Sequence, residues 1–330
     1  MELPVYKRMM IFSGTANRPL AEEIATHLGM KLGEVEIATF SNSESYGRFS
    51  ESVRGMDAFV IQSMCAPVDH FLMQQLIMID ALRRASAKRV TAVCPLYPYS
   101  RQDRKARGRE PITGKLVADM FEVAGADRVL SVDLHSGQIQ GFFNVPFDHL
   151  TAMPLLADYF APLLNDDFVI VSPDPGGVRL ADKFVQHLDE YKGLSGGQVA
   201  FLHKRRRHDT RNESETHGVV GDVEGKLCVV IDDLIDTAGT LTQGVDKLLE
   251  AGATDVYAAA THAILSDPAV DRIKNSPVKQ IVVTNTLPIP SEKQLDKLVI
   301  ISIAPTIAQT IKAVFEEESV SELFHGENQP

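Results

Sequence analysis

The sequence predicts an α/β fold made of two similar domains, each with a mainly parallel sheet flanked by helices. Short apolar runs alternate with stretches of helical apolar spacing along the chain, which is the pattern of consecutive βαβ units. After the midpoint the alternation starts again, and 330 residues are enough for two domains with full hydrophobic cores.

A weak internal repeat supports two copies of one fold. Residues 53–61 match residues 223–231 at identical internal spacing, and residues 80–90 likewise match residues 246–256. Both matches are displaced by about half the chain, as a duplication requires.

The individual elements follow from these patterns. In the first half we expect strands at 9–12, 58–61 and 90–93, with helices at 20–28 and 72–85. In the second half we expect strands at 168–171, 199–202, 227–231, 256–260 and 280–283, with helices at 155–160, 178–188 and 242–251. The strand at 227–231 is a continuous apolar run, which suits a strand buried on both faces.

Domain boundaries are expected after residues 148 and 306. The first follows an extended, Pro-containing connection, so residues 1–148 would form the N-terminal domain and residues 149–306 the C-terminal domain. Residues 307–330 would form a last helix and a tail that pack back on the N-terminal domain.

Composition indicates a cytoplasmic globular protein that binds neither nucleic acid nor membranes. Hydrophobic residues make up 44% of the chain and charged residues 23%, and the net charge is −11, which disfavours polyanionic surfaces. No stretch is long enough to span a bilayer. Cys65, Cys94 and Cys228 stand in apolar surroundings without metal-ligand spacing, which fits reduced thiols.

The clearest chemical motif follows the strand at 227–231. Asp232 and Asp233 stand where that strand is expected to end, and small residues follow at 237–240 before the next helix. Ligands of open α/β sheets bind at this position, and the free N–H groups of a helix N-terminus suit a phosphate. Because the acids would repel a bare phosphate, we expect a sugar phosphate whose hydroxyls meet the carboxylates, directly or through Mg²⁺. The alternative is a solvated acidic turn that caps a helix.

The first half lacks this motif. At the positions that match Asp232 and Asp233 it has Gln62 and Ser63, so only the second copy is expected to hold a sugar phosphate.

A basic segment at 97–111 predicts a polyphosphate ligand such as ATP. It has no apolar periodicity that would anchor a helix, so we interpret it as a mobile loop. Five cations within nine residues of an acidic protein favour a polyanionic target, although a solvated basic turn is the alternative. These cations are Arg101, Arg104, Lys105, Arg107 and Arg109.

Three further strand ends carry polar side chains. His135 follows an apolar run that begins at residue 130, and Asp174 follows the strand at 168–171. Residues 201–207 end a strand in a run of cations. Taken singly, a histidine at a strand end is more often structural than a ligand, and a basic run more often faces solvent.

The motif at 227–240 resembles the phosphoribosyl-pyrophosphate (PRPP) binding motif of type I phosphoribosyltransferases and of ribose-phosphate pyrophosphokinases. Residues 99–105 (YSRQDRK) are very similar to the flexible loop of the pyrophosphokinases and foreign to the transferases. The likeness extends from residue 12 to residue 324. It implies two duplicated phosphoribosyltransferase-like (Rossmann-like) domains, with ATP-binding loops in the first and the ribose 5-phosphate site in the second.

The resemblance implies transfer of the pyrophosphoryl group of Mg²⁺–ATP to ribose 5-phosphate, giving PRPP and AMP for nucleotide biosynthesis. The implied catalytic residues are Lys204 and Arg206, and the implied Mg²⁺ ligands are His135 and Asp174. The implied ATP-binding residues are Phe40, Asn42, Ser43, Glu44, Arg101, Gln102, Asp103 and His135. The implied ribose 5-phosphate residues are Arg206, Asp232, Asp233, Asp236, Thr237, Ala238, Gly239 and Thr240.

The resemblance also implies regulation and assembly. Relatives are hexamers built from dimers, and many bind phosphate and ADP as effectors between subunits. The matching residues are Ser52, Arg54, Ser319, Ser321 and Phe324. The alternative is that residues 319–324 cap a last helix at 307–315 that docks on the first domain.

One departure from the family pattern affects nucleotide choice. The family has Asp-Gly before the glutamate of its adenine turn, whereas this chain has Asn42-Ser43 before Glu44. Two other functions stay open: a phosphoribosyltransferase, which the basic loop disfavours, and a non-catalytic regulatory relative, which the presence of Lys204 and Arg206 disfavours.

Overall fold

The computed structural model describes residues 8–206, 214–324 and 326–328, and gives the backbone alone at residues 204–206 and 214–217. The chain divides into two compact units. The first comprises the described residues up to Thr151, the segment Thr286–Pro288 and the described residues from Ile303 onward. The second comprises Ala152–Asn285 and Ile289–Ser302.

The first unit contains a parallel five-stranded sheet with the order β1-β4-β5-β6-β7. Its strands are β1 (Met9–Ser13), β4 (Asp57–Ile61), β5 (Arg89–Cys94), β6 (Arg128–Val132) and β7 (Phe147–Leu150). β4 is buried along its whole length, as expected of a strand with parallel neighbours on both sides. A separate antiparallel hairpin is made by β2 (Val35–Thr39) and β3 (Ser45–Phe49).

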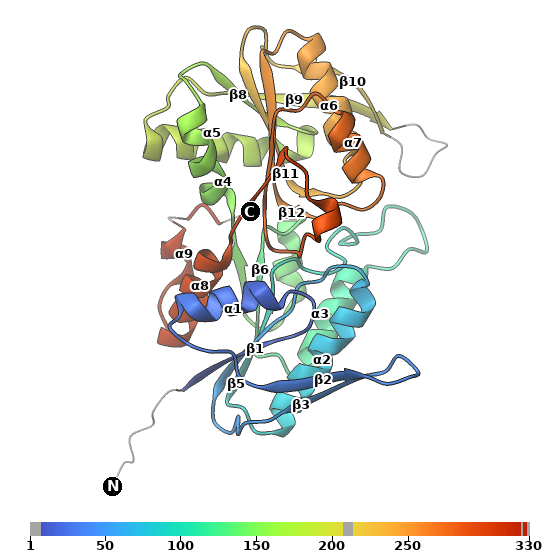
Figure 1. Cartoon of the computed structure of the whole chain (residues 1–330), viewed down its shortest axis with the longest axis vertical. Coiled ribbons are helices and arrows are strands. Elements are labelled where there is room, and N and C mark those ends of the chain that lie inside the picture. Colours follow the sequence, from blue (N-terminus) through green and yellow to red (C-terminus); the bar gives the residue numbers. More distant parts are fainter. Residues whose placement is uncertain (1–7, 207–213, 325, 329–330) are drawn as a thin grey trace. The chain divides into compact units, whose positions relative to one another are not determined.

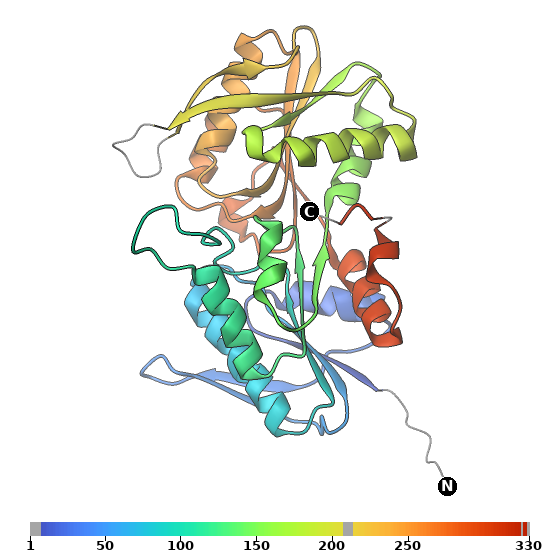
Figure 2. The same cartoon turned by 180° about the vertical axis from the view of Figure 1, so that it is seen from behind.

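Helices cover both faces of this sheet. Figures 1 and 2 show α2 and α3 on one face, and α1 with α8 on the other. The helices are α1 (Arg18–His27), α2 (Val68–Arg84), α3 (Thr113–Ala124), α8 (Ala304–Glu316) and α9 (Val320–Leu323), with a 3₁₀ segment η1 (Gly137–Phe142). Gly125 follows the last residue of α3, and its φ of 104° lies in the left-handed region that glycine adopts at low cost.

The second unit contains a seven-stranded sheet with the order β10-β9-β8-β11-β12-β13-β14, parallel except where β10 pairs with β9. Its strands are β8 (Phe168–Ser172), β9 (Gln198–Arg206), β10 (Ser214–Val220), β11 (Leu227–Ile235), β12 (Asp255–Ala263), β13 (Ile281–Thr284) and β14 (Leu298–Ile301).

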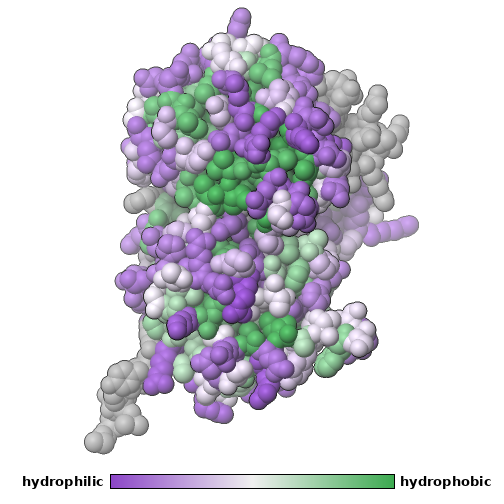
Figure 3. Space-filling model, in the orientation of Figure 1, coloured by the Kyte–Doolittle hydropathy of each residue, from purple (hydrophilic) through white to green (hydrophobic). Residues whose placement is uncertain are grey.

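This sheet also lies between two helical layers, with α4 and α5 on one face and α6 and α7 on the other (Figure 1). The helices are α4 (Met153–Phe160), α5 (Val178–Lys192), α6 (Gly239–Glu250) and α7 (Ala269–Asn275), with 3₁₀ segments η2 (Ala161–Leu163), η3 (Pro175–Gly177) and η4 (Ser291–Lys293). In Figure 3 apolar residues gather on the visible surface of this unit, in the region where Figure 1 labels β11 and β12.

The two units repeat one topology, as the internal repeat predicts. The order β1-β4-β5-β6-β7 of the first sheet corresponds to β8-β11-β12-β13-β14 in the second. Phe59 of β4 pairs with Ile11 of β1 and with Thr91 of β5. In the same way, Val229 of β11 pairs with Ile170 of β8 and with Tyr257 of β12. The predicted α/β class with mainly parallel sheets is therefore confirmed. The copies differ in their hairpins, because β9–β10 joins the main sheet whereas β2–β3 stays separate.

The structure differs from the expected elements at three places. β11 does not end at residue 231 but continues through the acids to Ile235, because its backbone keeps pairing with β12. α6 begins at Gly239 rather than at residue 242. The predicted boundary after residue 306 falls inside α8, which begins at Ala304.

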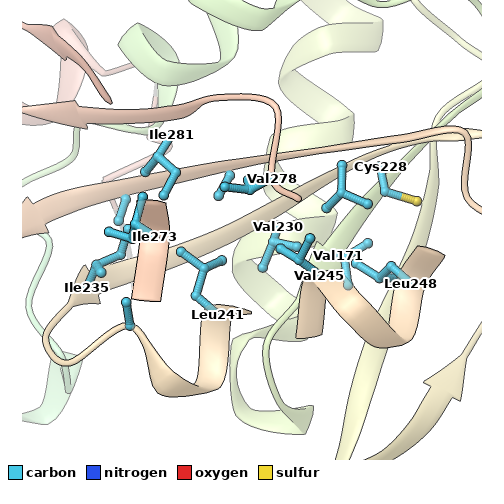
Figure 4. Packing of buried hydrophobic residues seen from close by; sticks show 14 of the residues in the cluster. Val171, Cys228, Val230, Ile235, Leu241, Val245, Leu248, Ile273, Val278 and Ile281 are labelled. Carbon is cyan, nitrogen blue, oxygen red and sulfur yellow. The ribbon is translucent and has the colours of Figure 1, made fainter. Parts of the chain in front are cut away.

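The core of the second unit fixes the corner between β11 and α6. Ile235 at the end of β11, Leu241 of α6 and Ile273 of α7 belong to one buried apolar cluster (Figure 4). No helix within the described ranges is both long and apolar enough to cross a membrane.

Candidate active site

The acidic pair lies at the carboxyl end of β11, where one neighbouring strand has already ended. β8 pairs with β11 only as far as Val230, whereas β12 continues beside Asp232, which pairs with Ala260. β11 therefore projects its last residues past the end of β8. Projecting strand ends of this kind form the ligand crevice of open α/β sheets.

Three carboxylates of the second unit interact at this edge. Burial, the neighbouring carboxylate of Asp233 and the carboxylate of Asp174 raise the pKa of Asp232 well above its usual range. Asp174 follows β8 and accepts a hydrogen bond from the N–H of Gly176 at 2.9 Å, so its side chain is held in place. The strand ends of β8 and β11 thus bring together Asp174 and the acidic pair, which the sequence predicts separately.

The loop after β11 has the geometry expected of an anion-binding turn. Ala238, the residue before α6, has a φ of 56°, and its own side chain makes no capping hydrogen bond. The first N–H groups of a helix have no acceptor within the helix. Thr237 is exposed, and Asp236, Gly239 and Thr240 are half-buried. The N-terminus of α6 therefore offers donors beside the acidic pair.

Arg272 of α7 is a member of this site that sequence reasoning missed. Its Nη1 donates to the carbonyl oxygen of Thr237 at 2.9 Å, and the same nitrogen lies 3.0 Å from where a Cβ on Gly239 would stand. A single arginine in a short helix gives no signal in the sequence, because the contact depends on how α7 packs beside α6.

Lys204 and Arg206 lie among the last three residues of β9. Their backbones pair with Thr216 and Ser214 of β10. Their side chains lie outside the described part of the chain, as does Arg207, the last residue of the predicted basic run.

In the first unit, the expected adenine turn closes the hairpin β2–β3. The side chain of Phe40 is 55% exposed and its ring lies 5.9 Å from that of Tyr46. Asn42 Oδ1 accepts from the N–H of Glu44 at 3.2 Å, and Ser43 has a φ of 73°. The turn thus holds a serine in a left-handed conformation that usually selects glycine.

The basic segment forms an exposed irregular loop anchored at both ends. Near its start, the Gln102 side chain bonds Thr113 Oγ1 at 2.6 Å, and the Gln102 carbonyl oxygen accepts from Gly114 at 3.1 Å. Near its end, the Glu110 carboxylate accepts from the N–H groups of Ala106 and Arg107, both at 2.9 Å. The five cations themselves are exposed, while Asp103 is half-buried. Gln102 therefore fixes the base of the loop in this conformation.

His135 is exposed and follows β6 by three residues, after Asp133, whose φ of 36° turns the chain away from the sheet. His135 belongs to the first unit and Asp174 to the second, so the two expected Mg²⁺ ligands lie on different units. Among the described residues, no group of three or more His, Cys, Asp and Glu side chains is arranged to hold a metal ion.

The carboxylates of the second unit, those of Asp174, Asp232 and Asp233, are nevertheless chemically suited to a hard cation. Mg²⁺ is held by one or two carboxylates together with water and phosphate oxygens, which suits the carboxylates of Asp174 and Asp233 beside Asp232, whose pKa they raise.

The corresponding corner of the first unit is filled by its own side chains. Gln62 follows β4 as Asp232 follows Ile231, and its Nε2 donates to Gln74 Oε1 at 2.5 Å. Gln74 Oε1 also accepts from the N–H of Thr15 at 2.9 Å, and Gln62 Oε1 accepts from the N–H of Ala16 at 3.1 Å. Both glutamines are buried, so amide groups occupy the space that is acidic in the second unit.

The expected effector residues all lie in the first unit. Ser52 is exposed, and Arg54 donates to Ser86 Oγ at 3.2 Å. Ser319 precedes α9, and the exposed Ser321 lies within it. Phe324 is only 5% exposed, which favours the packing interpretation for this residue.

The chain is similar to proteins of one known family along both units. One family model, the N-terminal domain of ribose phosphate pyrophosphokinase, matches residues 9–125, and a second, the phosphoribosyl synthetase-associated domain, matches residues 207–325. The ribose-phosphate pyrophosphokinase of Streptomyces coelicolor is 52% identical over 319 residues, with 96% of each chain covered. That of Mycobacterium leprae is 51% identical over 322 residues, with 97% of each chain covered.

A solved structure gives the same result. The phosphoribosylpyrophosphate synthetase from Mycobacterium smegmatis matches with a TM-score of 0.86 and 50% identity, covering 94% of this chain and 100% of that one. Since the identity and coverage extend over both units, the chain belongs to the ribose-phosphate pyrophosphokinase family.

Proposed function

We propose that the protein transfers the β,γ-pyrophosphoryl group of Mg²⁺–ATP to the anomeric hydroxyl of ribose 5-phosphate, giving PRPP and AMP for nucleotide biosynthesis. The observation that carries the proposal is the corner between β11 and α6, where carboxylates and a helix N-terminus meet. The curated relatives that carry the name ribose-phosphate pyrophosphokinase support it.

The phosphate of ribose 5-phosphate matches the loop before α6, and its ribose hydroxyls match the acidic pair. The loop Asp236–Thr240 would hold the 5-phosphate with its N–H groups and the hydroxyls of Thr237 and Thr240. Asp232 and Asp233 would accept hydrogen bonds from ribose hydroxyls, which orients the anomeric oxygen.

The reaction needs positioning and charge stabilisation above all. A bond forms between the anomeric oxygen and the β-phosphorus, and the bond from that phosphorus to the α,β-bridging oxygen breaks. AMP leaves with the bridging oxygen, and the proton of the anomeric hydroxyl is released. We assign Lys204 and Arg206 to the negative charge on the transferred group. We assign the basic loop, beginning with Arg101, Gln102 and Asp103, to ATP.

Mg²⁺ fits this scheme as the required cofactor. When bound, it neutralises phosphate oxygens, and His135 and Asp174 are the ligands that we assign to it. Phe40 offers an exposed ring for the adenine, and Asn42 and Glu44 offer polar groups beside it.

Regulation, assembly and location are further proposals from family membership. We assign phosphate and ADP as effectors of the segments that contain Arg54 and Ser319, a hexamer built from dimers as the assembly, and the cytoplasm as the compartment. Cys94 and Cys228 are buried free thiols, and burial raises the pKa of Cys228 to about 12, so reduced cysteines suit the fold.

The decisive experiment follows a label in ATP. The purified protein is incubated with ribose 5-phosphate, Mg²⁺ and ATP labelled at the β-phosphate. Label in a sugar diphosphate, with AMP as co-product, supports the proposal. ADP as the main product would contradict it, and absence of turnover in an assembled protein would favour the non-catalytic relative.

A control addresses the phosphoribosyltransferase alternative. The protein is incubated with PRPP and a mixture of nucleobases, without ATP. Release of pyrophosphate that depends on a base would indicate a transferase, whereas the proposed enzyme should leave PRPP intact.

A further inference from the structure

Arg272 is carried by a helix that is anchored in the core directly below the phosphate loop. Ala269 and Ile273 of α7 are buried, and Ile273 packs in the apolar cluster with Ile235 and Leu241, which flank the loop in sequence (Figure 4). α7 and α6 pack against one another. Arg272, which precedes Ile273, is therefore held at a fixed place beside the loop.

The guanidinium group of Arg272 fixes one peptide of that loop. Its Nη1 donates to the carbonyl oxygen of Thr237 at 2.9 Å. Because a trans peptide is planar, with its C=O and N–H pointing in opposite directions, this bond also fixes the direction of the N–H of Ala238. Ala238 has a φ of 56°, in the left-handed region that is unfavourable for a non-glycine residue. A contact that holds this peptide therefore opposes relaxation of the loop.

The same group stands against the first residue of α6. A Cβ on Gly239 would lie 3.0 Å from Nη1 and 3.5 Å from Cζ of Arg272. Glycine at this position thus allows the guanidinium to approach the helix N-terminus closely. The approach places a fixed positive charge beside a loop whose own ionisable side chains, Asp236 and the preceding acidic pair, are carboxylates.

We propose that Arg272 is a positioning residue for the ribose 5-phosphate site. It holds the peptide between Thr237 and Ala238 in the conformation that receives the phosphate, and it lowers the repulsion that the carboxylates exert on that anion. This inference rests on the proposed function, because it assigns the loop to the sugar phosphate. It predicts a role in sugar-phosphate affinity that is separate from ATP affinity.

The test compares three variants in steady-state kinetics. Arg272→Met removes the charge and the donor but keeps the apolar stem, and Arg272→Lys restores a cationic donor. Lys274→Met removes the same charge from an exposed position of the same helix, two residues further on. We expect Arg272→Met to raise KM for ribose 5-phosphate about tenfold, as loss of a charge-assisted hydrogen bond does, with KM for ATP and the thermal midpoint unchanged. Arg272→Lys should recover most of the loss.

Other results would overturn the inference. An unchanged KM for ribose 5-phosphate in Arg272→Met, an equal rise in Lys274→Met, or an equal rise in KM for ATP would each exclude a specific positioning role. If the unmodified protein makes no PRPP, the proposed function fails separately. Calorimetric titration of ribose 5-phosphate into the same variants then decides, since the inference requires weaker binding to Arg272→Met than to the other proteins.

Discussion

The carboxylate of Asp232 accepts a hydrogen bond from the backbone N–H of Asp233 at 2.9 Å, although the two adjacent residues carry like charges. The bond favours the ionised form of Asp232, but burial and the charge of Asp233 outweigh it and raise the pKa of Asp232. Asp232 therefore holds its proton to a higher pH than an ordinary aspartate does.

The first prediction concerns Asp232→Asn and pH. Since the native protein holds a proton that the unfolded chain releases, stability falls as pH rises from the usual carboxyl value through the raised pKa of Asp232. Asparagine does not titrate, so the variant should gain stability relative to the unmodified protein over this window. Urea unfolding between about pH 4 and about pH 8 measures the difference.

The same variant should lose activity while it gains stability. We expect turnover to fall at least ~100-fold, because a preorganised polar group at the reacting sugar is lost. A pH-independent difference in stability would show that Asp232 titrates normally.

The second prediction is that Lys204→Ala lowers turnover by roughly two or more orders of magnitude. The reason is loss of a cationic residue near the end of β9 that we assign to the charge of the transferred group. Lys274→Ala, at an exposed position, serves as the control. Near-normal turnover of a folded Lys204→Ala protein would exclude its catalytic role.

The third prediction separates the two substrates. Asp236→Asn and Thr240→Val should weaken ribose 5-phosphate more than ATP, because both residues belong to the loop before α6 and its first turn. Titration of each substrate at saturating concentration of the other measures the effect. If ATP affinity alone falls in both variants, the two sites are assigned the wrong way round.

The fourth prediction concerns the adenine turn. Ser43→Gly should raise the free energy of unfolding by about 0.5–1 kcal/mol, because a φ of 73° strains serine more than the flexibility of glycine costs in the unfolded chain. Ser45→Gly, within β3, should lower it by a similar amount. Chemical denaturation of both variants gives the sign, and a loss of stability in Ser43→Gly would refute the argument.

The fifth prediction tests regulation through Arg54, which is exposed and bonds Ser86 at 3.2 Å. Phosphate should activate the enzyme and ADP should inhibit it beyond competition with ATP, and Arg54→Ala should blunt both effects. Arg18→Ala, which removes an exposed ion pair with Glu22, is the control.

A chain truncated before Ser319 should also lose regulation. It additionally loses the buried Phe324 and the hydrogen bond from Asn328 to the His149 carbonyl oxygen, so its thermal midpoint must be measured in parallel. Purely competitive inhibition by ADP, with no effect of phosphate at fixed ionic strength, would leave these segments a structural role only.

The sequence by itself determined the parallel α/β class, the duplication and the copy that carries the acidic corner. These features depend on local patterns: continuous apolar runs mark buried parallel strands, and the matched segments around Ile61 and Ile231 differ in the two residues that follow. Strands without such a run escaped prediction, among them the half-exposed β2 and β7.

Only the tertiary structure showed which residues surround the acidic pair in the second unit and which side chains fill the corresponding position in the first. β11 continues through Asp232 because β12 supplies backbone partners, which side-chain polarity does not reveal. Arg272 reaches Thr237 across 35 residues of sequence, and Gln62 meets Gln74 only where α2 packs on the sheet. Such hydrogen bonds depend on the separation of packed elements to within a few tenths of an ångström, which spacing along the chain does not encode.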